Sequence, residues 1–97
     1  MPAYLIAEVE VIDPVAYEGY KTIAEESIAA HGGRYLVRGG AAEALEGESP
    51  KRLVVLEFPS AAAAYGWYRS IEYAEGRKIR QGAARSRVII AEGVPTT

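Results

Sequence analysis

Two kinds of ionisable side chain in this sequence could move protons: one histidine and several strand glutamates. His31 is the only histidine, and its unperturbed pKa near neutrality suits a general acid or base at the mouth of a pocket. Its position just before Gly32 and Gly33 places it in the last turn of an expected helix. There the helix dipole favours a surface cation with no chemical role, so both interpretations stay open.

Three glutamates lie within or at the end of segments whose other residues are largely apolar: Glu8, Glu57 and Glu92. If their faces coincide, three carboxylates gather on a largely buried surface, with Glu57 as the candidate catalytic carboxylate. Unpaired buried charge is costly, so we expect partners such as Arg34 or Arg38. The alternatives are ordinary salt bridges at an interface or its rim, and a polar cluster that binds substrate or holds a shifted pKa.

A second set of candidates is aromatic and basic, and we expect it to line a pocket. The chain has seven tyrosines against one phenylalanine, and a buried tyrosine hydroxyl needs a hydrogen-bond partner. The alternative is that these aromatics only fill the core, as is usual at helical spacing. The expected cleft lies between helices and sheet, with His31 or Arg80 at its edge. The predicted ligand-binding residues are Tyr20, Arg38, Trp67, Tyr68, Tyr73 and Arg80.

The sequence does not contain the residues that several other kinds of chemistry require. The chain has no cysteine, which removes disulfides, thiolate nucleophiles and cysteine-ligated metals. A single histidine excludes a multi-histidine metal site within one subunit, and nothing specific indicates a mixed site with carboxylates. No phosphate-binding loop, G-x-S-x-G elbow or dinucleotide-binding glycine pattern is present. We therefore predict neither a bound metal nor a cofactor.

Composition and charge narrow the possible partners further. The 97 residues predict one domain, residues 1–97, and the net charge is −2 with a pI near 5.4. A nucleic-acid partner is not expected, because no surplus of lysine and arginine is available to neutralise phosphates. No apolar run approaches the ~20 residues that span a bilayer, and the first eleven residues resemble a strand more than a signal peptide. We expect a cytoplasmic protein with no membrane contact.

The elements that must position these side chains alternate between strand and helix. Alternating or continuous apolar runs predict strands. Aspartate followed by proline starts the first helix at Asp13 and Pro14, and Ser60 and Ser70 are expected caps in the second helical region, with a bend near Gly66. The predicted strands are residues 4–11, 34–38, 52–58 and 87–92. The order predicts an α+β, ferredoxin-like βαββαβ fold with a four-stranded antiparallel sheet and helices on one side.

The sheet has more apolar surface than one copy's helices can cover. The runs Leu53-Val54-Val55-Leu56 and Val88-Ile89-Ile90 are apolar on both faces, whereas a sheet with one wet face alternates. A bare second face would expose roughly several hundred Å². We therefore expect a homodimer that packs sheet to sheet. The alternative is a monomer whose polar loop, residues 39–51, or whose tail folds over the sheet.

Several of these segments together resemble the domain-of-unknown-function family 1330, from Met1 to about Gly93. The segments that carry the resemblance are Tyr17 and Tyr20 after Asp13-Pro14, AAHGGRYLVRGG at 29–40, EFPS at 57–60, WYxSxEY at 67–73 and AEG at 91–93. The resemblance implies a dimeric α/β-barrel and supplies no established activity. One departure is Ile71, where relatives often have proline at the helix start. Similar dimeric barrels include cofactor-free monooxygenases and haem-binding enzymes, an analogy of fold alone.

Two functions remain open at this stage. The first is an enzyme or sequestering protein for a small planar or carboxylated metabolite, held by tyrosines, with His31 or a glutamate moving a proton. The second is a non-catalytic assembly or ligand-sensing module whose polar residues only set the register of the dimer.

Overall fold

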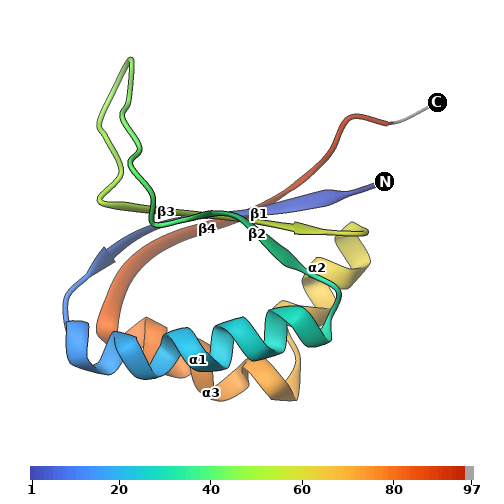
Figure 1. Cartoon of the computed structure of the whole chain (residues 1–97), viewed down its shortest axis with the longest axis horizontal. Coiled ribbons are helices and arrows are strands. Elements are labelled where there is room, and N and C mark those ends of the chain that lie inside the picture. The colour runs from blue at the N-terminus through green and yellow to red at the C-terminus, as the bar shows by residue number, and fades with distance from the viewer. Residues whose placement is uncertain (96–97) are drawn as a thin grey trace.

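The computed structural model describes residues 1–95; residues 96 and 97 of the predicted domain lie outside the described residues. Its elements follow in the predicted order, with two helices in the second helical region (Figure 1). They are β1 (Ala3–Val11), α1 (Pro14–Ala30), β2 (Arg34–Arg38), β3 (Arg52–Phe58), α2 (Ala61–Tyr68), α3 (Ile71–Ala83) and β4 (Ala84–Glu92).

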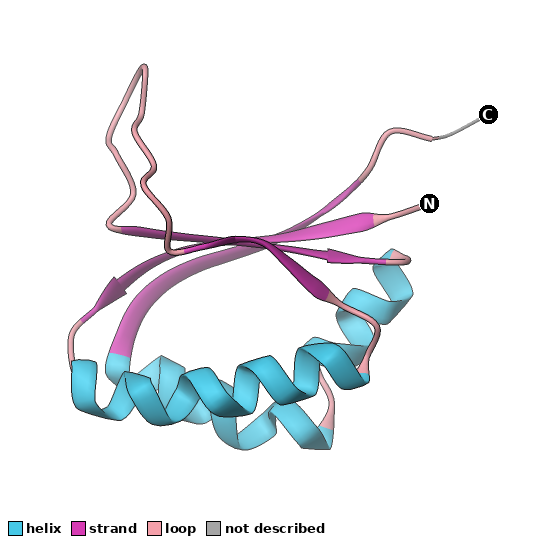
Figure 2. Cartoon of the chain, viewed as in Figure 1, coloured by secondary structure: helices cyan, strands magenta, loops and turns pink. Residues whose placement is uncertain are grey.

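The four strands form one antiparallel sheet in the order β2-β3-β1-β4. All three helices lie on the same face of this sheet, so the described part of the molecule has two layers (Figure 2). The predicted ferredoxin-like βαββαβ topology is therefore confirmed.

The first helix begins and ends where the sequence predicts. Asp13 is the N-cap, and its side chain accepts a hydrogen bond from the Ala16 N–H at 3.1 Å. Pro14 occupies the first turn, where a backbone N–H has no helical partner. After the C-cap at His31, Gly32 has φ +78°, the left-handed conformation that ends many helices.

Serine caps divide the second helical region into two. The Ser60 hydroxyl accepts from the Ala63 N–H at 3.1 Å, and the Ser70 hydroxyl accepts from the Tyr73 N–H at 3.2 Å. Ser70 also donates to the Trp67 carbonyl at 2.7 Å, which ties the start of α3 to the end of α2. α2 continues through Gly66, so the chain changes direction at Ser70 and not at the predicted bend.

The core lies between the helices and the inner face of the sheet. Leu5, Ala7 and Val9 of β1 are buried, as the alternating pattern predicts. Among the largest fully buried side chains are Phe58 from β3 and Trp67 from α2. This packing fixes which side of each strand faces the helices.

The fourth strand is longer than predicted because no loop separates it from α3. Ala84 caps α3 yet already has an extended backbone, so β4 begins there and not at Arg87. The carbonyl of Ala83 accepts hydrogen bonds from the backbone N–H groups of Ile12 and Asp13 at 2.8 and 2.9 Å. These contacts fix the junction against the end of β1.

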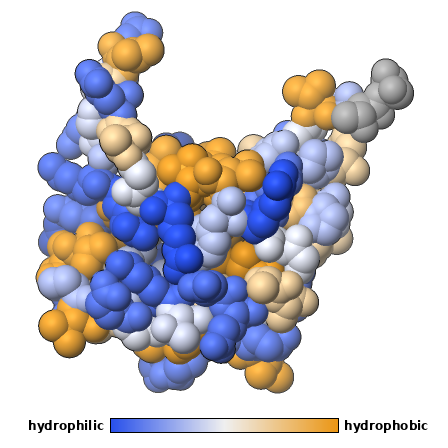
Figure 3. All heavy atoms as spheres, viewed as in Figure 1, coloured by the Kyte–Doolittle hydropathy of each residue, from blue (hydrophilic) through white to orange (hydrophobic). Residues whose placement is uncertain are grey.

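The outer face of the sheet carries an apolar row across all four strands. Ile6 lies opposite both Val55 and Ile89, and Val55 lies opposite Val37. Paired residues share a face, so these four side chains are adjacent. No described helix lies over them, and the loop of residues 39–51 projects away from the sheet (Figure 1). Figure 3 shows apolar atoms gathered between this loop, at upper left, and the C-terminal end of the described chain, at upper right.

Candidate functional site

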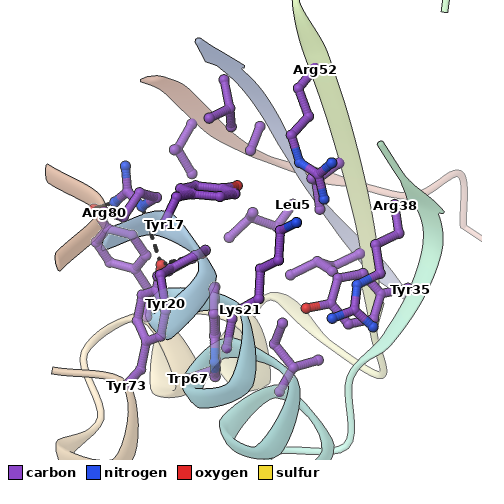
Figure 4. A pocket seen from close by; sticks show the side chains of 18 residues that line it. Leu5, Tyr17, Tyr20, Lys21, Tyr35, Arg38, Arg52, Trp67, Tyr73 and Arg80 are labelled. Carbon is purple, nitrogen blue, oxygen red and sulfur yellow. Dashed lines mark hydrogen bonds between the residues drawn. The ribbon is translucent and has the colours of Figure 1, made fainter. Parts of the chain in front are cut away.

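All six predicted ligand-binding residues line one cavity between the helices and the inner face of the sheet (Figure 4). They are Tyr20, Arg38, Trp67, Tyr68, Tyr73 and Arg80. The space open to the centre of a water molecule is about 30 Å³, enough for very few waters. The cavity is therefore narrow as the side chains stand.

One end of the cavity is a hydrogen-bonded group of three tyrosines and an arginine, the tyrosine–arginine cluster: Tyr20, Tyr68, Tyr73 and Arg80. The Tyr20 and Tyr73 hydroxyls are 2.9 Å apart. Arg80 donates through Nε to the Tyr73 hydroxyl at 3.3 Å and through Nη2 to the Tyr68 hydroxyl at 3.4 Å. These groups come from three helices, so packing of the helix layer assembles the cluster.

The environment keeps the Tyr20 hydroxyl protonated. Burial raises the pKa of Tyr20 well above its ordinary value, and the neighbouring Tyr73 hydroxyl raises it further. Burial also raises the pKa of Tyr35, elsewhere in the same cavity. Both hydroxyls therefore stay protonated at neutral pH, so neither can serve as a base.

Trp67 forms a buried wall of the cavity and is held firmly. Its side chain is 2% exposed, and its Nε1–H donates to the Ser27 hydroxyl at 2.9 Å. Ser27 in turn donates to the Ala24 carbonyl at 3.2 Å. The Trp67 and Tyr73 rings have centroids 4.0 Å apart. These hydrogen bonds account for a buried serine in the last turn of α1.

The opposite end of the cavity is basic (Figure 4). Arg38 donates to Glu25 at 3.1 Å, and Lys21 donates to Glu18 at 2.9 Å. Arg52 has a buried Nε with no hydrogen-bond partner among the described residues, and its guanidinium lies 5.8 Å from the centre of the Tyr17 ring. This end can attract a negatively charged group.

Among the lining residues that sequence reasoning did not select, four are aromatic or basic: Tyr17, Lys21, Tyr35 and Arg52. The sequence did contain a signal for Arg52. Arg52, Val54, Leu56 and Phe58 are every second residue of β3, so their side chains point to the same face. Phe58 and Leu56 are core residues, so Arg52 shares the inner face. Lys21 follows directly after Tyr20 and resembles an ordinary solvated helix residue.

The two predicted catalytic residues lie away from the cavity. His31 Nε2 is 3.0 Å from Glu72 Oε1, so the pair joins the end of α1 to the start of α3. Hydrogen bonds from the Glu72 backbone, and secondly from His31, lower the pKa of the Glu72 carboxyl. Glu57 lies on the outer face, where the Arg34 guanidinium donates to it at 2.7 Å. Catalytic roles for His31 and Glu57 stay predictions, and the cavity does not bring these residues together.

The three strand glutamates do not form one cluster. Glu8 and Glu57 share the outer face, whereas Glu92 lies opposite Ala3 and so faces the helix side. Glu8 accepts from Arg87 at 3.1 Å. The condition for a shared carboxylate surface is therefore not met, because β4 pairs with β1 in a register that turns Glu92 toward the helix side.

Within residues 1–95, no group of three or more histidine, aspartate or glutamate side chains is arranged to hold a metal ion. In the same part of the chain, no helix has the length and apolar character needed to cross a bilayer.

The family of the chain follows from a sequence profile that matches residues 2–94, described as a domain of unknown function, DUF1330. The chain belongs to this family. The match covers nearly the whole sequence and confirms the resemblance drawn from the motifs above. A comparison with curated proteins found no match.

Solved structures show the same fold at low sequence identity. The RPA0582 protein of unknown function from Rhodopseudomonas palustris is 24% identical with a TM-score of 0.78, over 98% of this chain and 84% of that one. SnoaB from Streptomyces nogalater, described as a cofactor-independent oxygenase, is 10% identical with a TM-score of 0.64, over 98% and 95% of the two chains. A protein from Bacteroides fragilis, described as dimeric with a ferredoxin-like fold, is 14% identical with a TM-score of 0.64, over 95% and 96%.

Proposed function

We propose that this DUF1330 protein is a homodimer that binds a small organic molecule in the cavity between its helices and its sheet. The observation that carries the proposal is the tyrosine–arginine cluster, which places polar groups from three helices against a cavity that also has apolar walls. Ligand sites commonly combine apolar and aromatic walls with a few convergent polar groups. A core built only for stability would favour phenylalanine or leucine, which bring no hydroxyl that needs a partner.

Binding in this cavity requires some side chains to move. About 30 Å³ is too little for a molecule with an aromatic ring. The Lys21 and Arg38 side chains are both partly exposed, and each makes one surface ion pair, which contributes little free energy. The Arg38 guanidinium also lies 4.3 Å from the centre of the Tyr35 ring. Tyr68 is the last residue of α2 and is half-buried. Movement of these side chains enlarges the cavity without unfolding an element.

The outer face of the sheet supports the homodimer. The apolar row of Val37, Val55, Ile6 and Ile89 is bordered by two ion pairs, Arg34–Glu57 and Arg87–Glu8. An apolar centre with a polar rim is the usual composition of a protein interface. The structurally similar Bacteroides fragilis protein is described as dimeric, in agreement with this proposal.

A thermal-shift screen of small organic molecules on the purified protein tests the ligand-binding proposal. A ligand at about 100 times its dissociation constant adds roughly 2.7 kcal/mol of stability, so a true ligand raises the melting temperature by several degrees. Trp67 is the only tryptophan, so its fluorescence should change with the same ligands.

The variants Tyr20→Phe and His31→Gln form a matched pair for any stabilising molecule. Tyr20→Phe removes a hydroxyl from the cavity, and the ligand should bind more weakly. His31→Gln changes a residue outside the cavity and should leave binding unchanged. Equal weakening in both variants, or stabilising ligands that never alter Trp67 fluorescence, would place binding elsewhere. A screen with no stabilising molecule would favour an assembly module without a ligand.

A further inference from the structure

The cavity is lined by more positive charge than the carboxylates around it neutralise. Four cationic side chains line it, Lys21, Arg38, Arg52 and Arg80, and no aspartate or glutamate is among its lining residues. The chain as a whole has a net charge of −2, so this concentration of cations is local. Lys21 and Arg38 have carboxylate partners on the surface, whereas Arg52 and Arg80 have none within 4.0 Å among residues 1–95.

Arg80 is the most deeply buried of these cations. It is only 6% exposed, and a charge removed from water is costly without an opposite charge. Its hydrogen bonds go to neutral hydroxyls, those of Tyr73 and Tyr68. Arg80 lies in the last turn of α3, where the helix end supplies a partial negative charge of about one half. The positive charge of Arg80 is therefore only partly compensated.

The tyrosine–arginine cluster also has more donors than acceptors. A guanidinium carries five N–H donors and accepts nothing, and each tyrosine hydroxyl supplies one proton. Arg80 uses two donors on Tyr73 and Tyr68, and the Tyr20–Tyr73 hydrogen bond uses one hydroxyl proton. Whichever of Tyr20 and Tyr73 donates, the other keeps a free proton, as does Tyr68. An incoming acceptor with two oxygens fits this surplus of donors.

Open grooves lead to the cluster along the helix side of β4. One groove of about 370 Å³ has a mainly polar lining that includes Arg80, Gln81 and Ser86. A neighbouring groove of about 320 Å³ is lined by Leu5, Ile90 and others. Tyr68 and Val88 line both grooves and the enclosed cavity. An acidic group can reach Arg80 from the first groove while an apolar body lies across Tyr68 and Val88.

We infer that the ligand of this site is an organic carboxylate with a flat apolar body, and that its carboxylate binds the Arg80 guanidinium beside the Tyr68 hydroxyl. This rests on the proposed function of the cavity as a ligand site. A planar guanidinium fork matches the two oxygens of a carboxylate. The carboxylate supplies the negative charge and the acceptors that the cluster lacks, and the aromatic and aliphatic walls take the rest of the molecule.

Matched acid and amide pairs test the inference by isothermal titration calorimetry at pH 7. Suitable probes are benzoate with benzamide and 2-naphthoate with 2-naphthamide, because each pair differs mainly in charge. Hydrogen bonds to charged groups contribute about 1.5–3 kcal/mol, so the acid should bind at least about tenfold more tightly than its amide. This comparison uses the unaltered protein and does not depend on any variant.

Arg80→Met identifies the group responsible, with Lys78→Met as the control. Both variants remove one positive charge from α3, but Lys78 is exposed and does not line the cavity. Arg80→Met should abolish the preference for acid over amide, and the control should keep it. Arg80→Met should also melt no lower than the unaltered protein when no ligand is present, because it removes a buried charge that lacks an anion. Should it fail to fold, Tyr68→Phe should still reduce the preference.

The outcomes separate this inference from the proposed function. Acid and amide binding equally tightly would overturn the carboxylate assignment and leave the cavity as a ligand site. Acid preference that persists in Arg80→Met would also overturn the assignment to Arg80. If neither member of any pair binds and the thermal-shift screen finds no ligand, the proposed function fails and the inference with it.

Discussion

The hydrogen bond between Tyr20 and Tyr73 joins α1 to α3 inside the cavity at 2.9 Å. Both hydroxyls belong to residues whose rings pack in the core or against it. A phenylalanine at either position would fill most of the same volume, so the hydroxyl is what distinguishes this site from ordinary packing. The cluster therefore gives tyrosine a role at these positions that apolar burial alone does not explain.

Because the pKa of Tyr20 is raised, the free energy of unfolding should change with pH in the alkaline range. The unfolded chain releases this proton near pH 10, whereas the folded chain holds it to higher pH because Tyr20 is buried. Stability from this group is therefore complete below about pH 10 and decreases as pH rises above that value. Urea unfolding between pH 8 and 11 should show the decrease.

The variant Tyr20→Phe tests the origin of that pH dependence. It should lose about 1 kcal/mol at pH 7, the usual net value of one hydrogen bond, and its stability should fall less steeply above pH 10. A slope identical to that of the unaltered protein would mean that other groups cause the alkaline loss.

At the scale of elements, the junction between α2 and α3 sets the positions of Tyr68 and Tyr73. Ser70 caps α3 and also bonds the carbonyl of Trp67. Ser70→Ala should cost about 0.5–2 kcal/mol, the range for loss of an N-cap, as measured by urea unfolding. Ser86→Ala, on an exposed site of β4, should change stability by less than about 0.5 kcal/mol. Equal effects would show that the cap contributes nothing specific.

Local signals made most of the elements predictable. Asp13 with Pro14, and the serines at 60 and 70, are side chains that satisfy helix N-termini, so each helix start is encoded by neighbouring residues. The start of β4 was not predictable because α3 continues into the strand at Ala84 with no turn residue between them. The inward face of Glu92 depends on strand register, which residues far apart in the chain decide.

The candidate site was predictable in part for the same reason. Tyr73 and Arg80 lie two helical turns apart on α3, and Tyr20 lies one turn before the buried Ala24 on α1, so the periodicity of each helix predicts that these side chains face the sheet. The position of Arg52 near the Tyr17 ring and the pairing of Arg38 with Glu25 depend on how β2 and β3 lie against α1, which no local pattern encodes. The absence of carboxylates from the cavity is likewise a property of the assembled layers.

At the scale of the whole molecule, the outer face of the sheet should control assembly. Val55→Asp places a charge in the centre of the apolar row, opposite Ile6 and Val37. Desolvating an unpaired charge in an interface is costly, so the dimer should dissociate, as seen by size-exclusion chromatography with light scattering. Val15→Asp is the control, because Val15 is an exposed apolar residue of α1, and it should leave the dimer intact. An unaltered protein that stays monomeric at high concentration would contradict the assembly proposed here.

The most direct measurement of ligand binding uses the indole N–H of Trp67, because the chain has one tryptophan and its side chain lines the cavity. A ¹⁵N-labelled sample gives a single indole cross-peak in a two-dimensional NMR spectrum. Titration with 2-naphthoate should move that cross-peak to a saturating end point, and 2-naphthamide should move it much less at the same concentrations. A cross-peak that does not move while calorimetry detects binding of 2-naphthoate would place the ligand elsewhere and contradict the account.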